Sequence, residues 1–395
     1  MGRFVEVVRG LYYEEELLRS LTRFIEWSEL VELFSAVKRP CRKYFVRVNT
    51  ALISAGELVD LLRSRGFEVY QHEFIEEAIW FPVEGPFELP VADKVVVADK
   101  YAAESVYQGA DLYAPGVVKA NGVKRGDDVL VVAPTGEPVG FGVAVMDGEE
   151  MIKRRRGLAV RVLISVYRAP KVKELPEYRM GLIYDQSLPA QVVTRVLDPQ
   201  PGEVIVDMCA APGGKTTHIA QLLRGRGVVY AFDDSSTRIK RLEYEVKRMK
   251  LRNVVVIKHD SRYIHVDYPT LRAHKVLIDP PCSALGVRPK LYDVKSYREV
   301  IGCSEYQKQF LREAVKILVR GGVIVYSTCT ITPEENEEIV RYAIEKLSLE
   351  LEDTEYRKLG SPALPLLGRE KGVIRFYPHR HDTPGYFIAK FRKRN

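Results

Sequence analysis

The second half of the chain alternates short, almost wholly apolar runs with helical patterns. The apolar runs are Val204–Met208, Val228–Asp233, Val254–Ile257, Lys275–Asp279 and Val323–Tyr326. Helical patterns at 216–223, 237–250 and 304–318 separate them. Strands that are nearly continuous in apolar residues are typical of a parallel sheet covered on both faces by helices. The pattern therefore predicts an α/β fold with a doubly wound, Rossmann-like sheet over residues 198–395.

The first half of the chain shows a different pattern of predicted helices and strands. Residues 1–91 combine a helical pattern at positions 17–30, a β-rich run at Tyr44–Thr50 and a Ser54-x-x-Glu57 capping box, which indicate a small α+β part. Residues 92–168 are short β-prone runs separated by glycine turns, which favour a small β-barrel. Residues 169–197 are interpreted as a linker that returns to the first part.

Composition narrows the class of protein. The chain has 395 residues, 46% hydrophobic and 29% charged, with a net charge of +7 that suits a polyanionic partner without requiring one. Five cysteines with no C-x-x-C pair indicate neither disulfides nor a zinc site, so we expect no metal and a reducing, cytoplasmic setting. No run of about 18 apolar residues occurs, so no association with a membrane is expected.

The segment Asp207-Met-Cys-Ala-Ala-Pro-Gly-Gly-Lys-Thr216 lies between the first predicted strand and its helix. Such a turn directs backbone N–H groups and a helix N-terminus toward an anionic group. A P-loop needs a glycine where Cys209 stands, and the G-x-G-x-x-G dinucleotide fingerprint is absent. S-adenosylmethionine, whose carboxylate could lie against the loop, is therefore the predicted cofactor.

Two acidic residues follow the next strands. Asp233 ends the second strand, where a carboxylate can accept both ribose hydroxyls, although NAD enzymes use the same device. Asp260 follows the third strand. It could lie near the adenine or could simply cap a turn, and the sequence leaves both interpretations open.

The fourth strand leads into Asp279-Pro-Pro-Cys282 and the fifth into Cys329. Because the carboxyl ends of parallel strands meet at one edge, both thiols and the aspartate should lie beside the cofactor. A thiolate that adds to carbon 6 of cytosine makes carbon 5 nucleophilic, and it can leave afterwards. An aspartate can also accept a hydrogen bond from the exocyclic amine of cytosine.

These motifs, with Tyr326-Ser-Thr-Cys329, Glu335-Asn336 and Arg375-x-x-Pro378-His379, closely resemble the Sun-type RNA 5-methylcytosine methyltransferases over essentially the whole chain. The resemblance implies that Cys329 is the nucleophile, that Cys282 assists release, and that Asp279 and Lys215 contact the reacting cytosine. It also implies a set of donor-binding residues: Cys209, Ala210, Ala211, Pro212, Gly213, Gly214, Lys215, Asp233, Asp260 and Asp279.

Two further resemblances concern the first half of the chain. Arg47-Val-Asn-Thr50 and the helix after it resemble the RRM-like N-terminal part of that family. The segments 109–116 and 123–129 resemble a PUA domain, a small RNA-binding barrel. The subgroup with a PUA domain resembles methyltransferases of cytosine 72 in the tRNA acceptor stem, and implies that the barrel holds the tRNA 3′ end. Candidate phosphate contacts are Lys124, Arg125, Lys153, Arg154, Arg155 and Arg156.

Two alternatives remain open at this point. The catalytic half alone cannot distinguish tRNA from rRNA as the substrate. A non-catalytic RNA-binding or assembly factor is a different class of protein, but the intact set of Cys282, Cys329, Asp279 and Lys215 argues against it. No feature of the sequence indicates an obligate protein partner.

Overall fold

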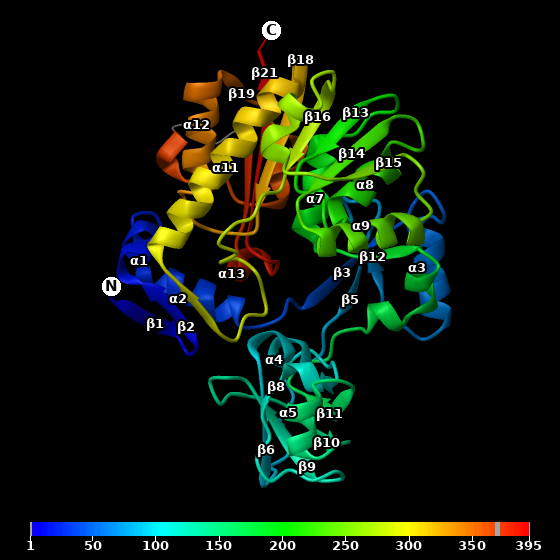
Figure 1. The fold of residues 1–395 in the computed structure, drawn as a ribbon, viewed down its shortest axis with the longest axis vertical. Coiled ribbons are helices and arrows are strands. Elements are labelled where there is room, and N and C mark those ends of the chain that lie inside the picture. Colours follow the sequence, from blue (N-terminus) through cyan, green and yellow to red (C-terminus); the bar gives the residue numbers. More distant parts are fainter. Residues whose placement is uncertain (1, 368–371, 395) are drawn as a thin grey trace.

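The computed structural model describes residues 2–367 and 372–394, and its largest sheet has eight strands and forms the upper part of the molecule in Figure 1. The strand order is β15-β14-β13-β16-β18-β21-β19, with β20 paired to β21. The strands are β13 Val204–Asp207, β14 Val228–Asp233, β15 Val254–Lys258, β16 Ala273–Ile278, β18 Leu318–Thr328, β19 Leu349–Leu351, β20 Val373–Phe376 and β21 Tyr386–Lys393. The neighbours from β15 to β18 are parallel, and β21 runs antiparallel to β18.

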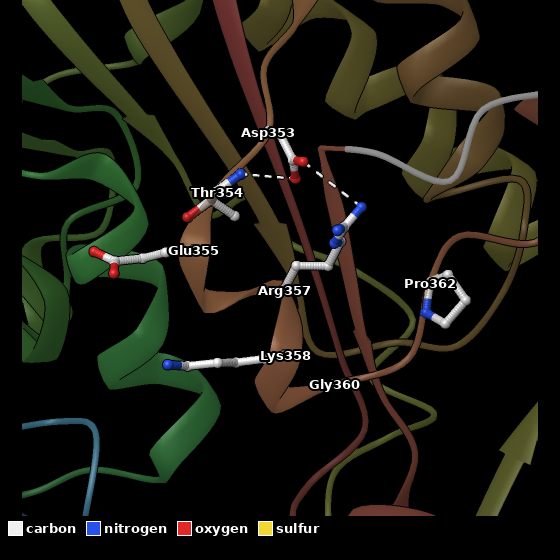
Figure 2. Close-up of a pocket in the computed structure, with 7 residues that line it drawn as sticks. All are labelled: Asp353, Thr354, Glu355, Arg357, Lys358, Gly360 and Pro362. Carbon is white, nitrogen blue, oxygen red and sulfur yellow. Dashed lines mark hydrogen bonds and ion pairs between the residues drawn. The ribbon is translucent and has the colours of Figure 1, made fainter.

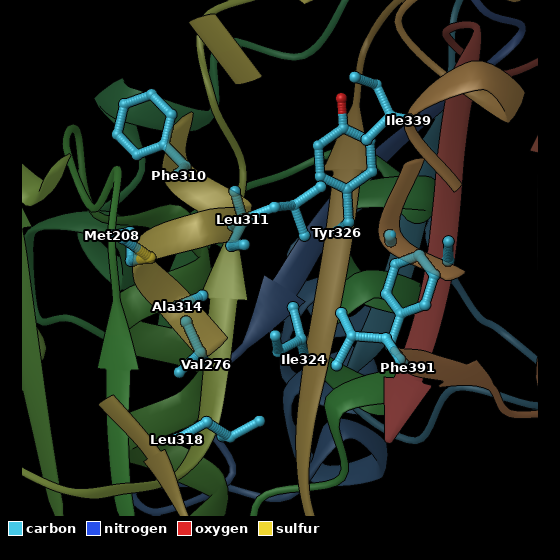
Figure 3. Close-up of a cluster of buried hydrophobic side chains, with 14 of the residues drawn as sticks. Met208, Val276, Phe310, Leu311, Ala314, Leu318, Ile324, Tyr326, Ile339 and Phe391 are labelled. Atoms are coloured by element: carbon cyan, nitrogen blue, oxygen red, sulfur yellow. The ribbon is translucent and has the colours of Figure 1, made fainter. Parts of the chain in front are cut away.

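Helices cover both faces of this sheet, as the alternation predicted. They are α7 Leu188–Leu197, α8 Gly214–Leu222, α9 Ser236–Arg248, α10 Ile264–Asp267, α11 Tyr297–Ile317 and α12 Glu337–Leu347. The short α13 (Pro378–His381) lies against the N-terminal part instead. Val276 and Ile324 pack with α11 residues in one cluster (Figure 3), whereas the next residue of each strand, Leu277 and Val325, packs under α7 and α8. Since successive residues of a strand face opposite ways, both must be apolar. The predicted α/β fold is confirmed.

The helical pattern near the N-terminus divides into two short helices. A hairpin of β1 (Phe4–Val8) and β2 (Leu11–Glu14) leads into α1 (Glu15–Thr22) and α2 (Trp27–Val37). A strand from the second half of the chain, β17 (Asp293–Lys295), pairs in parallel with β2. The N-terminal unit is therefore bound to the segment that follows Cys282.

A four-stranded antiparallel sheet forms the next part, in the order β12-β3-β5-β4. Its strands are β3 Lys43–Val48, β4 Tyr70–Gln71, β5 Ala78–Pro82 and β12 Ile183–Asp185. The helix α3 (Ala55–Ser64) begins at the Ser54–Glu57 capping box, as predicted. After the short α6 (Pro176–Arg179), β12 returns to this sheet, and α7 then packs on the large sheet although its residues precede position 198.

The PUA-like part protrudes from the rest of the molecule in Figure 1. Its elements are β6 Lys94–Ala98, α4 Lys100–Val106, β7 Leu112–Tyr113, β8 Val117–Lys119, β9 Asp128–Val132, β10 Pro138–Ala144, α5 Gly148–Arg154 and β11 Leu158–Ser165. The strand order is β7-β11-β10-β9-β6-β8, so β7 and β8 are the two edges. They are joined by one 3-10 turn at Ala114–Gly116, and the sheet thus curls around its own core. Within residues 2–367 and 372–394, no helix combines the length and apolar character needed to cross a bilayer.

Buried charges join the N-terminal α+β part to the helices that cover the eight-stranded sheet. Glu77, which is fully buried just before β5, accepts hydrogen bonds from Arg195 Nε at 2.8 Å and from His218 Nε2 at 2.5 Å. Burial lowers the pKa of His218 to about 4, so the imidazole is neutral near pH 7 and donates its N–H. Arg195 lies on α7 and His218 on α8, so one carboxylate anchors two helices.

Replacing Glu77 with alanine should destabilise the protein by about 3 kcal/mol, because it leaves Arg195 partly buried without its carboxylate. The adjacent Glu76 has a side chain that is 73% exposed, so Glu76→Ala is a matched control expected to change stability by less than about 0.5 kcal/mol. Urea unfolding followed by circular dichroism measures both. Equal, small effects would contradict the anchoring role of Glu77.

Candidate active site

The loop between β13 and α8 is held from inside the fold. Asp207 is buried at the end of β13 and accepts a hydrogen bond from Thr216 Oγ1 at 2.7 Å, which closes the turn. Burial raises the pKa of Asp207 to about 7. Gly213 has a φ of 114°, and a Cβ there would lie 2.9 Å from a methyl carbon of Leu242 on α9. This glycine is therefore needed both for the turn and for the close packing of α9.

A cavity of about 240 Å³ lies at the carboxyl ends of the parallel strands. Its lining residues are Met208, Cys209, Ala211, Asp233, Asp234, Arg238, His259, Asp260, Ser261, Asp279, Pro280, Pro281, Cys282, Ala284, Tyr306, Phe310 and Cys329. Five of the residues predicted to bind the methyl donor, and both cysteines predicted to be catalytic, are among them. The other predicted donor residues, Ala210, Pro212, Gly213, Gly214 and Lys215, form the rest of the turn and the first residues of α8.

Two of the four acidic residues that line the cavity, Asp233 and Asp260, are already held by local hydrogen bonds. Asp233 accepts from the backbone N–H of Ser235 at 3.0 Å and lies 3.1 Å from Arg238. Asp260 accepts from the backbone N–H of Arg262 at 3.0 Å and also lines the cavity. The two interpretations of Asp260 are thus compatible: the residue caps a 3-10 turn and faces the cavity.

The two cysteines meet at one end of this cavity. Cys282 follows β16 and Cys329 follows β18, which are neighbours in the sheet, and the two sulfurs lie 3.2 Å apart as free thiols. The two thiols are within hydrogen-bond distance, and either sulfur can be the donor. When Cys329 is the thiolate, the Cys282 S–H donates to it, and this contact lowers the pKa of Cys329 and raises that of Cys282. Cys209 also lines the cavity, but burial raises the pKa of its thiol well above the ordinary value. Cys329 is therefore the thiol best suited to act as a nucleophile.

A buried carboxyl group holds the two cysteine loops together. Glu335 accepts a hydrogen bond from the backbone N–H of Ser283 at 2.9 Å, from Gln307 Nε2 at 2.9 Å and from Thr332 Oγ1 at 2.9 Å. A backbone hydrogen bond from Gly286 N to Cys329 O at 3.0 Å adds a second link. The spacing of the two sulfurs therefore depends on Glu335, which the sequence identified only as part of a motif.

A cluster of polar side chains around Lys215 and Asp279 lies beside Cys329. Lys215 Nζ donates to Asp279 Oδ2 at 2.6 Å and to the hydroxyl of Tyr386 at 2.8 Å, while Ser327 donates to the other oxygen of Asp279 at 2.7 Å. Burial alone would lower the pKa of Lys215, but the ion pair with Asp279 raises it, so the amine stays protonated. The structure thus brings Lys215 and Asp279 together as predicted. Tyr386 was not singled out because it belongs to no recognisable motif, and Ser327 was noted only as part of the motif Tyr326-Ser-Thr-Cys329.

A buried arginine from the N-terminal part supports the start of α8. Arg47, on β3, donates to Gln186 Oε1 at 2.6 Å, to the carbonyl of Gly214 at 2.5 Å and to Thr217 Oγ1 at 2.8 Å. Burial lowers the pKa of Arg47 to about 9, and the guanidinium still carries a proton at neutral pH. The α+β part therefore buttresses the donor loop, a role that sequence reasoning missed because no local pattern pairs these residues.

The predicted phosphate contacts of the PUA-like part lie in the turn before β9 and at the C-terminal end of α5. Lys124 and Arg125 lie in the turn before β9, and Lys124 Nζ lies 3.6 Å from Asp147, next to the start of α5. Lys153 and Arg154 pair with Glu149 and Glu150 of the same helix. Arg155 and Arg156, at the end of α5, are exposed as well. Part of the positive charge is therefore compensated locally.

A separate hollow lies along the segment after β19 (Figure 2). Its lining residues are Asp353, Thr354, Glu355, Arg357, Lys358, Gly360 and Pro362. Asp353 and Arg357 pair with each other at 3.6 Å. None of the predicted site residues lies there, so the chemistry belongs to the strand-end cavity.

The geometry of the thiol pair gives a titration prediction. Iodoacetamide should alkylate Cys329 at a lower pH than Cys282 or Cys209, because the thiolate of Cys329 accepts the Cys282 hydrogen bond. Cys282→Ala should shift the pH profile of Cys329 alkylation upward, and Cys282→Ser, which keeps an O–H donor, should shift it less. Peptide mass spectrometry measures the rate at each cysteine. If the pH profile of Cys329 alkylation were unchanged in Cys282→Ala, Cys282 would be excluded as the hydrogen-bond donor to the Cys329 thiolate.

Comparison with known proteins places this site in a family. The model of the 16S rRNA methyltransferase RsmB/F family matches residues 194–392, and the PUA domain model matches residues 94–164. A Pyrococcus horikoshii protein named tRNA (cytosine(72)-C(5))-methyltransferase is 44% identical over 96% of this chain and 97% of its own length. The Mus musculus tRNA (cytosine(72)-C(5))-methyltransferase NSUN6 is 31% identical over 97% of this chain and 94% of its own length.

A solved structure agrees with these sequence matches. The crystal structure of NSun6 from Pyrococcus horikoshii with SFG has a TM-score of 0.89 at 43% identity, and the match covers 97% of this chain and 99% of that one. The resemblance stated from the motifs is thereby confirmed. The chain belongs to the Sun, or RsmB/F, family of S-adenosylmethionine-dependent methyltransferases and carries a PUA domain within it.

Proposed function

We propose that this protein transfers a methyl group from S-adenosylmethionine to carbon 5 of a cytosine in tRNA, at position 72 of the acceptor stem. The observation that carries the chemistry is the pair of free thiols 3.2 Å apart beside the strand-end cavity. The target position is supported by the cytosine-72 methyltransferases of two organisms, which match nearly the whole chain, PUA domain included.

The residues of the cavity fit the proposed methyl donor. Asp233 and Asp260 offer carboxylate oxygens for hydroxyl and amino groups, and Gly213 and Gly214 offer backbone N–H groups at the N-terminus of α8. When bound, S-adenosylmethionine supplies an electrophilic methyl group. The similar archaeal structure was solved with SFG, an analogue of this donor.

The proposed reaction begins at Cys329. Its thiolate adds to carbon 6 of the cytosine, which makes carbon 5 a nucleophile toward the methyl group. Asp279, held by Lys215 and Ser327, can accept from the exocyclic amine of the base, and protonated Lys215 can stabilise the developing negative charge. Once carbon 5 carries the methyl group, a base takes the carbon-5 proton. The electrons of that C–H bond re-form the double bond between carbons 5 and 6, and the carbon–sulfur bond breaks to return the Cys329 thiolate. Cys282, 3.2 Å away, assists this last step.

The rRNA alternative has weaker support. The family model that matches residues 194–392 is described for a 16S rRNA methyltransferase, and a human 28S rRNA (cytosine(4447)-C(5))-methyltransferase matches 55% of this chain. These matches concern about half of the chain, whereas the cytosine-72 enzymes match at least 96% of it. The PUA-like part therefore favours tRNA as the substrate.

The two cysteines are expected to differ sharply when replaced. Cys329→Ala should abolish methylation, since no adduct can form, while RNA and donor binding persist. Cys282→Ala should still attack the base but release it slowly, so a covalent protein–RNA species should accumulate on denaturing electrophoresis. Both substitutions remove one sulfur atom, so poorer packing alone predicts similar, modest effects and no trapped complex.

Cys209→Ala is a matched control for the loss of a cavity thiol, because Cys209 has a strongly raised pKa and no proposed covalent role. It should neither trap RNA nor prevent adduct formation. Trapping in Cys329→Ala would instead show that the two roles are exchanged. Full activity in both Cys282→Ala and Cys329→Ala would remove the covalent mechanism.

The PUA-like part should hold the tRNA 3′ end through the basic residues around α5. Removal of the 3′-terminal nucleotides should therefore weaken methylation of tRNA while donor binding is unchanged. Replacing Arg155 and Arg156 together should lower the salt dependence of tRNA binding by a log–log slope of roughly 0.7 to 0.9 for each phosphate that is no longer bound. Filter binding over a salt series measures this slope. If methylation of the trimmed tRNA were unchanged, the proposed binding of the tRNA 3′ end by the PUA-like part would be contradicted.

A further inference from the structure

The segment between Cys282 and α11 enters the hydrophobic core of the PUA domain. We call residues 284–295 the linking segment; Figure 1 shows it descending toward α4. Leu291, at its centre, is fully buried and belongs to the same apolar cluster as Val96, Ala103 and Val106 of the PUA domain. A residue of the catalytic half thus completes the core of another domain.

Polar contacts fix this insertion. The backbone N–H of Leu291 donates to Glu104 Oε1 of α4 at 3.1 Å. On the other side, a Cβ at Gly10 would lie only 2.3 Å from the carbonyl oxygen of Leu291, so the hairpin between β1 and β2 closes against the segment. Lys38 and Glu137 add an ion pair of 2.6 Å between α2 and the PUA domain. The PUA domain is therefore held at a defined place on the catalytic half.

The linking segment is equally well fixed at its catalytic end. Lys290, which is buried beside Leu291, donates from Nζ to the carbonyl of Ala284 at 2.7 Å and to Asp293 at 3.0 Å. Ala284 lines the cavity and has a left-handed φ of 56°, two positions after Cys282. A short, buried path of contacts thus runs from Glu104 in the PUA domain to the loop of Cys282.

We propose that Leu291 and Glu104 are positioning residues that set the distance and orientation between the PUA domain and the cysteine pair, and so select which nucleotide of a gripped tRNA reaches Cys329. This inference rests on the proposed function. Its physical basis is that the RNA is held by one domain and methylated by another. The precision with which the target base is positioned is therefore limited by how rigidly the two domains are joined. A misplacement of about 1 Å in an active site can cost roughly a hundredfold in rate.

The test compares Leu291→Ala and Glu104→Ala in the full-length protein on two substrates, intact tRNA and tRNA trimmed at its 3′ end. Both variants should lower kcat/KM for intact tRNA by about tenfold to a hundredfold and leave the value for trimmed tRNA nearly unchanged. On a tRNA with cytosines at positions adjacent to 72, sequencing of the product should show methylation spread to those neighbours. Donor binding should be unaltered.

Two variants serve as controls. Glu104→Gln keeps a carbonyl oxygen for the Leu291 N–H and should restore the activity and position selectivity that Glu104→Ala loses. Val294 lies in the same segment but is 41% exposed, so Val294→Ala should behave like the unaltered protein. Should Leu291→Ala fail to fold, the Glu104 pair decides the outcome.

Equal losses on intact and trimmed tRNA, with methylation still confined to one position, would overturn the inference and leave Leu291 and Glu104 with a purely structural role. Absence of methyl transfer to tRNA by the unaltered protein is a different result. It would overturn the proposed function, and this inference with it.

Discussion

The contact on which the active site depends is the meeting of Cys282 and Cys329, which are 47 positions apart in the chain. It exists because β16 and β18 are parallel neighbours, so the residues that follow them emerge at the same edge of the sheet. Adjacent strands alone bring two loops near each other without fixing their side chains. Glu335 supplies that precision, since a buried carboxyl group must have its hydrogen bonds satisfied and its partners lie on both loops.

The same principle extends to the domains. Arg47 and Glu77 place buried charges against α7 and α8, and buried charges are costly unless they are paired. Separating the α+β part from the catalytic sheet would leave these groups without partners. The N-terminal part is therefore a structural component of the site that is predicted to bind the methyl donor. Leu291 joins the PUA domain to the same body by apolar burial.

Local patterns explain what the sequence could predict. The alternation of apolar runs identifies the parallel strands, and the rule that ligands bind at their carboxyl ends then places Asp279, Cys282 and Cys329 together. The capping box at Ser54 is equally local. Leu291 and Tyr386 act across long separations in the chain, and nothing in their neighbours marks them. Arg47 lies in a segment that the family resemblance identified, but its contact with α8 could not be predicted from that segment. The final strands β19 to β21 were missed for a related reason, because antiparallel pairing leaves no alternation with helices.

The asymmetry of the two thiols also comes from such distant residues. A pair of identical groups at 3.2 Å could in principle share the proton either way. The contact between the two thiols has the largest effect on both pKa values, and burial and the charge of Asp279 disfavour the thiolate of Cys329. The positive charges of Lys215 and Lys290 act in the opposite direction and favour that thiolate. The carboxyl of Glu335 acts on Cys282 and favours its neutral thiol. Lys290 reaches this position only through the linking segment. Lys290, in the segment that joins the PUA domain to the rest of the chain, thus also acts to lower the pKa of Cys329.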